Sequence, residues 1–182
     1  MTRILGISGS LRAGSYNTAL LREMQAQAGD GVQFEMATLH GIPLYDGDVE
    51  ARDGIPETVD ALKARIVASD GVILATPEYN NSVPGVFKNA IDWLSRPPDD
   101  IPRVFGDRPF TLIGASIGGF GTILSQNAWL SVLRHLRTRI WVGDRVLVSR
   151  AGKAFDEQGE LIDEAVRAQL AKFAASFARF VE

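Results

Sequence analysis

The chain has 182 residues, 46% of them apolar, with a formal net charge of −3 and no cysteine. This length and apolar content predict one domain, residues 1–182, with a full core, and the mild charge argues against nucleic acid as a partner. The lack of cysteine excludes disulfides and thiolate chemistry, and no apolar run is long enough for a membrane span, so we expect a cytoplasmic protein.

Strand-like and helix-like segments alternate along the whole chain. Continuous apolar runs or strand-like patterns predict strands at residues 4–8, 32–37, 71–76, 110–116 and 140–148. Apolar residues at helical spacing predict helices at residues 17–28, 56–68, 84–94, 124–137 and 161–181. Residues 41–54 and the proline-rich segment 96–102 are expected to be loops.

Five strands alternating with five helices predict a doubly wound α/β fold, a parallel sheet with helices on both faces. Of the two common strand orders, five strands in one domain favour the flavodoxin-like order 2-1-3-4-5 over the dinucleotide-binding order. Ligands in such sheets bind outside the carboxyl ends of the strands, where the order reverses between strands 1 and 3. The loops after strands 1, 3 and 4 should therefore meet at one site.

The first of these loops reads SGSLRAGSYN, residues 8–17, and contains hydroxyls, glycines and one arginine but no acid. Because it leads into a helix, it offers free backbone N–H groups at the positive end of the helix dipole, which suits an anion. The sequence lacks G-x-x-x-x-G-K-[ST] and G-x-G-x-x-G here, so a terminal monophosphate is favoured over a triphosphate or a dinucleotide. The side chains available as donors are those of Ser10, Arg12, Ser15, Asn17 and Thr18. Asn17 is also expected to cap the helix.

The other two loops suit a flat ring. In TPEYNNSVPG, Tyr79 stands beside Asn80 and Asn81 with a proline at each side, which provides an aromatic surface and edge hydrogen bonds for a heteroaromatic ligand. In SIGGFG, residues 116–121, glycines allow the backbone to approach a ring closely. Each loop alone could be a solvated turn, but the loop after strand 2 carries acids instead, so the three polar loops favour a site.

These three motifs, with VFKNAIDWLSRP continuing the second, resemble the NADPH-dependent FMN reductase family over nearly the whole chain. The family includes flavodoxin-like quinone, chromate and azo-dye reductases. The resemblance implies bound FMN and hydride transfer from NADPH or NADH to a small acceptor such as a quinone, azo compound, chromate or free flavin. It also implies a homodimer or a homotetramer. Leu124 and Leu130 stand where the family often has arginines near subunit contacts, and Phe87 replaces the usual leucine.

The resemblance also assigns the site residues by position. It implies that the FMN phosphate is held by Ser10, Arg12, Ser15, Asn17 and Thr18. It places along the isoalloxazine ring Pro77, Glu78, Tyr79, Asn80 and Ser82. It closes the far side of the ring with Ser116, Gly118 and Gly119.

No side chain is expected to act as a catalytic acid or base, since FMN would carry the chemistry. The two histidines, His40 and His135, are expected to have structural roles, and no metal site is expected because the acids of residues 46–53 lack calcium-loop spacing. Two alternatives remain open. One is a flavodoxin-type electron carrier without its own substrate, and the other is a flavin-free enzyme acting on nucleotides or phosphoesters.

Overall fold

The computed structural model describes all 182 residues and contains one parallel sheet. Its strand order is β2-β1-β3-β4-β5, with β6 also paired to β4, so the predicted flavodoxin-like order is confirmed. The strands are β1 (Thr2–Ser8), β2 (Val32–Ala37), β3 (Gly71–Ala75), β4 (Pro109–Ala115), β5 (Arg139–Ile140) and β6 (Val146–Val148). Every pair of neighbouring strands is parallel.

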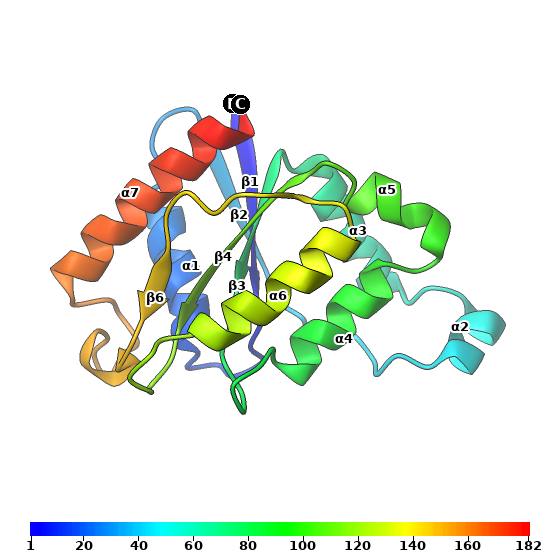
Figure 1. Cartoon of the computed structure of the whole chain (residues 1–182), viewed down its shortest axis with the longest axis horizontal. Coiled ribbons are helices and arrows are strands. Elements are labelled where there is room, and N and C mark those ends of the chain that lie inside the picture. The colour runs from blue at the N-terminus through cyan, green and yellow to red at the C-terminus, as the bar shows by residue number, and fades with distance from the viewer.

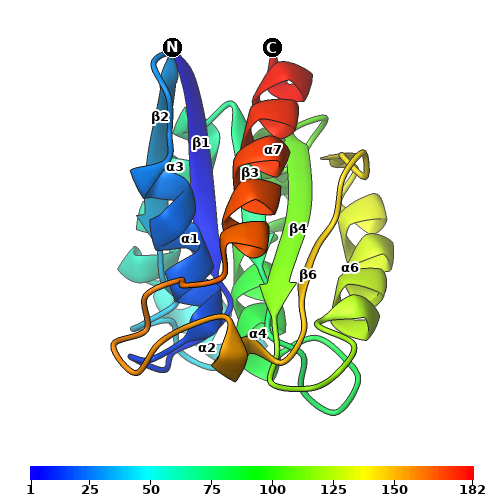
Figure 2. The same ribbon diagram turned by 90° about the vertical axis from the view of Figure 1, so that its left-hand side faces the viewer.

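Helices cover both faces of the sheet (Figures 1 and 2). The helices are α1 (Tyr16–Ala26), α2 (Gly47–Asp53), α3 (Glu57–Ala68), α4 (Gly85–Leu94), α5 (Ile101–Val104), α6 (Ile123–His135) and α7 (Glu164–Val181). Helices α1 and α7 pack on one face, and α3, α4 and α6 pack on the other. None of the helices is long and apolar enough to cross a membrane.

The central strands explain why two layers of helices are needed. In β3, Val72 and Leu74 enter the core cluster on the α3–α4–α6 face, while Ile73 and Ala75 enter the cluster on the α1–α7 face. All four side chains are fully buried. Because side chains alternate across a strand, an apolar residue at every position requires cover on both sides.

Several predicted boundaries are wrong. The segment 96–102 is not a loop throughout, because it contains a helical turn at Pro98–Asp100 and the start of α5. Residues 41–54 are not a continuous loop, because Asp46 caps α2 by accepting a hydrogen bond from the N–H of Asp48 at 2.9 Å. The helix expected from residue 161 begins at Glu164, where Asp163 is the cap. The last strand is split into β5 and β6 by residues 141–145; the N–H of Trp141 still donates to the carbonyl oxygen of Phe110 at 2.8 Å, and its ring packs on α7 with its centroid 5.0 Å from that of Phe173.

The three polar loops lie at the carboxyl ends of the strands, along the lower edge of the sheet in Figures 1 and 2. Close contact there depends on Gly114 in β4. A Cβ on this glycine would lie 2.0 Å from the hydroxyl oxygen of Thr122 and 2.4 Å from the carbonyl oxygen of Thr76. A glycine is therefore required to bring the ends of β3 and β4 against the start of α6.

At the opposite edge of the sheet, a buried lysine joins α3 to the segment that leads into α5. The ammonium group of Lys63, whose side chain is 1% exposed, donates to Oδ2 of Asp100 at 3.0 Å and to the carbonyl oxygen of Arg96. Arg103 donates two hydrogen bonds of 2.9 Å to the same carboxylate. Hydrogen bonds from Arg103 and then Lys63 hold the pKa of Asp100 well below its usual range.

We expect Asp100→Asn to lower the free energy of unfolding by about 2 kcal/mol at pH 7, because the buried ammonium loses the closer of its two carboxylates and keeps only Asp60, at 3.7 Å. The folded-state pKa of Asp100 lies below the unfolded value of about 3.9, so the carboxylate stabilises the fold above that pH and the effect is lost as pH falls. Urea unfolding of parent and variant should therefore show a gap that narrows below about pH 4. Exposed Asp99→Asn is the control, and an equal loss in both variants would contradict the assignment.

Candidate active site

The first loop ends in a helix cap that differs from the predicted one. Ser15, not Asn17, is the N-cap of α1, and its hydroxyl oxygen accepts a hydrogen bond from the N–H of Thr18 at 3.4 Å. The backbone N–H groups of Tyr16 and Asn17 have no acceptor within the chain. The first turn of α1 carries no acid. This helix end therefore retains free donors and an uncompensated positive dipole.

Asn17 and Thr18 hold the helix in place through their side chains. The amide of Asn17 donates to the carbonyl oxygen of Ala115 and accepts from the N–H of the same residue, both at 2.9 Å. The hydroxyl of Thr18 is hydrogen-bonded to that of Ser8 at 2.7 Å. Both side chains are buried. They tie the start of α1 to the ends of β1 and β4, so their direct contact with a phosphate stays a prediction.

Ser10, Arg12 and Ser15 keep donors that the chain itself does not use. The hydroxyl oxygen of Ser10 accepts from the N–H of Arg12 at 3.3 Å, and that of Ser15 accepts the cap hydrogen bond, so both hydroxyl hydrogens remain available. The Arg12 side chain is exposed and donates only to the carbonyl oxygen of Gly14, at 3.1 Å. With no carboxylate in the loop, this set of donors fits a phosphate dianion.

The first and second loops meet at Gly9. A Cβ on this residue would lie 2.2 Å from a ring carbon of Phe87 in α4 and 3.0 Å from Cδ of Pro77. The N–H of Gly9 also donates to the carbonyl oxygen of Ala75 at 2.9 Å. A glycine is therefore needed where the first loop passes beneath the second, and Phe87 is the side chain that fills the space.

The second loop is a tight two-residue turn. Tyr79 and Ser82 exchange backbone hydrogen bonds of 3.1 and 3.0 Å, and the two residues between them, Asn80 and Asn81, have φ of 50° and 61°. Asparagine is the residue that most readily takes left-handed backbone angles after glycine, which explains the Asn-Asn pair. Pro77 is buried at the base of the loop, while Asn80, Ser82 and the Tyr79 side chain, 46% exposed, project from it.

Glu78 has a structural contact that its sequence position did not reveal. One of its carboxylate oxygens accepts hydrogen bonds from the N–H groups of Leu124 and Ser125, at 2.9 and 3.0 Å. Thr122, the cap residue of α6, makes no side-chain cap hydrogen bond of its own. Glu78 therefore caps α6 from another part of the chain and joins the second loop to the helix that follows the third.

A buried hydroxyl pair strengthens the same connection. The Thr76 hydroxyl is 2.9 Å from that of Ser125 and accepts from the indole N–H of Trp129 at 3.0 Å. Thr76 and Trp129 are fully buried. The second loop and α6 are thus held together both at the surface and in the core.

The third loop is backed by a segment that the sequence analysis overlooked. The carbonyl oxygens of Ser116 and Gly118 accept from the N–H groups of Ala151 and Arg150, at 3.0 and 2.9 Å. The position of this segment could have been predicted from the sequence, because residues 149–153 follow the last strand and so reach the same edge of the sheet as the three loops. A Cβ on Gly119 would contact no atom within 4 Å. The chain itself does not require this glycine, which leaves room for a ligand beside it.

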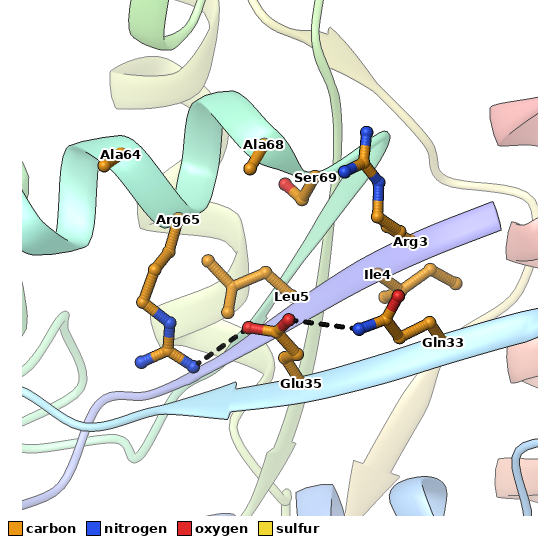
Figure 3. A pocket seen from close by; sticks show the side chains of 9 residues that line it. All are labelled: Arg3, Ile4, Leu5, Gln33, Glu35, Ala64, Arg65, Ala68 and Ser69. Carbon is orange, nitrogen blue, oxygen red and sulfur yellow. Dashed lines mark hydrogen bonds and ion pairs between the residues drawn. The ribbon is translucent and has the colours of Figure 1, made fainter.

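Two hollows in the surface lie away from these loops. Figure 3 shows one of about 320 Å³ near the amino ends of β1 and β2. Arg65 there lies 3.5 Å from the carboxylate of Glu35, and Arg3 also lines the hollow. A larger hollow of about 640 Å³ lies beside His135 at the end of α6. Neither contains a residue of the three loops.

We expect Glu78→Ala to destabilise the start of α6, because two backbone N–H groups lose their acceptor and the helix dipole loses a charge of opposite sign. Amide hydrogen exchange at Leu124 and Ser125 should become faster, and the free energy of unfolding should fall by about 1 kcal/mol. Glu78→Gln keeps an acceptor without the charge and should give a smaller effect. Unchanged exchange at both amides in Glu78→Ala would refute the capping role.

Comparison with known proteins identifies the family. The model of the family described as NADPH-dependent FMN reductase matches residues 2–153. An NAD(P)H-dependent FMN reductase of Pseudomonas aeruginosa is 45% identical over 165 residues, which cover 91% of this chain and 87% of that protein. A quinone reductase of Escherichia coli is 34% identical, covering 99% of this chain and 95% of that protein.

The fold agrees with these relatives. The structure of FerB, a flavoenzyme NAD(P)H:(acceptor) oxidoreductase from Paracoccus denitrificans, superposes with a TM-score of 0.86 at 32% identity, covering 100% of this chain and 97% of that one. Since these relatives are enzymes that match nearly the whole chain, the electron-carrier and flavin-free alternatives are not supported. The chain belongs to the NADPH-dependent FMN reductase family and is an oxidoreductase that uses FMN and NAD(P)H.

Proposed function

We propose that this chain, acting as one FMN-binding domain over residues 1–182, transfers a hydride from NAD(P)H through bound FMN to a small acceptor. FMN supplies the hydride chemistry when it is bound. One observation carries the proposal: hydrogen bonds of Asn17 and Glu78 hold the three polar loops together at one edge of the sheet. The chain's own task is to bind the cofactor, orient it and leave one face open.

The phosphate would be held by the first loop. The hydroxyls of Ser10 and Ser15, the guanidinium of Arg12 and the free N–H groups of Tyr16 and Asn17 form a donor set without a competing acid. The side chains of Asn17 and Thr18 would contribute by fixing the helix end. Hydrogen bonds to a charged partner are worth about 1.5–3 kcal/mol each, so even a few such contacts give useful affinity.

The ring would lie between the second and third loops. Pro77, Tyr79, Asn80 and Ser82 would line one side, with Glu78 holding their loop against α6. Ser116, Gly118 and Gly119 would close the far side. The N–H of Gly119 has no acceptor within the chain and is a candidate donor to the electron-rich edge of the ring.

Quinones are the acceptor class that the relatives favour. The Escherichia coli relative is a quinone reductase, and a Burkholderia relative, 33% identical over 98% of this chain, is a 2-hydroxy-1,4-benzoquinone reductase. A quinone is flat and apolar and can stack on an open ring face. Azo compounds, chromate and free flavin remain further candidates from the resemblance.

A homodimer, or a homotetramer, is the assembly we propose. Ile117, Phe120 and Leu124 are 78%, 84% and 44% exposed at the same edge as the candidate site. Exposed apolar side chains that gather on one surface are a mark of protein–protein contact. The cytoplasmic location also stays a prediction.

Arg12 provides the direct test of the phosphate site. We expect Arg12→Ala to weaken FMN binding about tenfold, because one charge-assisted contact is lost, with no change in riboflavin binding, since riboflavin has no phosphate. Arg12→Lys keeps the charge without the planar fork and should lose less affinity. Fluorescence titration of the flavin-free chain measures both ligands. Equal FMN affinity for parent and Arg12→Ala would place the phosphate outside this loop.

Steady-state kinetics test whether NAD(P)H and the acceptor use the same open face of FMN in turn. Hydride transfer needs the donor carbon about 3–3.5 Å from its target, and two ligands stacked on one face cannot both meet that distance. The oxidised nicotinamide must leave before the acceptor binds, so double-reciprocal plots against NADPH at several quinone concentrations should be parallel. Intersecting lines would mean that both substrates bind together, and the shared face would then be wrong.

A further inference from the structure

The exposed part of the first loop has one hydrogen bond to the rest of the protein. Residues 11–14 are all exposed, and the other hydrogen bonds of this segment join it only to Ser10 and to itself. The exception is Nε2 of His40, which lies 3.2 Å from the carbonyl oxygen of Leu11, 29 positions earlier in the chain. His40 therefore makes the one hydrogen bond that joins the tip of the loop to another part of the chain.

His40 is itself anchored for this contact. It follows Leu39, which is 3% exposed and belongs to the core cluster on the α3–α4–α6 face. Its other ring nitrogen, Nδ1, lies 3.1 Å from the hydroxyl oxygen of Thr38. Because the Leu11 carbonyl can only accept, Nε2 must carry the hydrogen, and the Thr38 hydroxyl can then donate to Nδ1. The neutral imidazole therefore satisfies both contacts.

The contact sets the direction of one peptide group. In a trans peptide the C=O of Leu11 and the N–H of Arg12 point in opposite directions. The carbonyl faces His40, and the N–H faces the hydroxyl oxygen of Ser10 at 3.3 Å. Since Ser10 accepts from this N–H, its own hydrogen is left to donate. A carbonyl turned inward would instead present a negative dipole to the anion.

We propose that His40 is a positioning residue for the phosphate loop: it holds the Leu11 carbonyl away from the anion and leaves the Ser10 hydroxyl free to donate to a phosphate oxygen. The inference rests on the proposed function, in which this loop binds the FMN phosphate. It revises the purely structural role expected for this histidine. His40 touches neither FMN nor substrate in this role and is not a catalytic residue.

The test compares two flavins on the full chain freed of bound flavin. His40→Ala should weaken FMN binding about three- to tenfold, the usual range for one net hydrogen bond, and leave riboflavin binding unchanged. His40→Gln places an amide donor near the position of Nε2 and should recover most of the affinity for FMN. His135→Ala, the other histidine in the chain, is the matched control and should bind both flavins like the parent.

The outcomes separate this inference from the proposed function. Ser10→Ala and Arg12→Ala, measured alongside, report on the phosphate site itself. If these two variants lose FMN affinity and His40→Ala does not, the role of His40 is wrong while the site stands. If His40→Ala weakens FMN and riboflavin equally, the residue acts on the fold and the inference is again overturned. If none of the three variants changes FMN affinity, the phosphate lies elsewhere and both proposals fail.

Discussion

The arrangement of the candidate site depends on one buried side-chain amide. Asn17 exchanges two hydrogen bonds of 2.9 Å with the backbone of Ala115, and β3 lies between the strand that precedes Asn17 and the strand that contains Ala115. The contact fixes the start of α1 against the end of β4. It therefore holds the first loop and the third loop at a set distance, across the place where the strand order reverses. A hydrophobic contact would hold these elements less specifically, because apolar packing has no direction.

Glu78 connects the second loop to the first and third loops. Its carboxylate reaches α6, so the helix that begins after the third loop is held by the loop after β3. Charge-assisted hydrogen bonds of this kind are about twice as strong as neutral ones. The two contacts, with the Thr76–Ser125 hydroxyl pair below them, join all three loops through polar groups that are already paired. A flat ring bound between them, as we propose, would therefore require little reorganisation of the protein.

Sequence reasoning predicts the parts of this molecule that depend on local pattern. The five strand positions, the helix on each face and the three loops follow from apolar periodicity and turn residues, and the strand order follows from their number. The roles of Asn17, Glu78 and His40 could not be predicted in this way. The backbone partner of Asn17 lies 98 positions away, those of Glu78 lie 46 and 47 positions away, and that of His40 lies 29 positions away. Only the folded chain determines which backbone group each of these side chains meets. The break between β5 and β6 was not predicted either, because the apolar pattern of residues 140–148 does not show where pairing with β4 is interrupted.

The acidic residues in the first turns of the helices give an electrostatic reason why the three polar loops, rather than the other loops, suit an anionic ligand. Helices α3 and α7, which follow β2 and β6, carry acids in their first turns, as most stable surface helices do. Helices α1, α4 and α6, which follow the three polar loops, carry none. For α6 the missing charge is supplied by Glu78 from a neighbouring loop. For α1 the first turn carries no acid, the N–H groups of Tyr16 and Asn17 are free, and the exposed guanidinium of Arg12 belongs to the same loop. The FMN phosphate, bound there as we propose, would complete this helix end, and part of its binding energy would arise from the same interaction that acids provide at other helix starts in the fold.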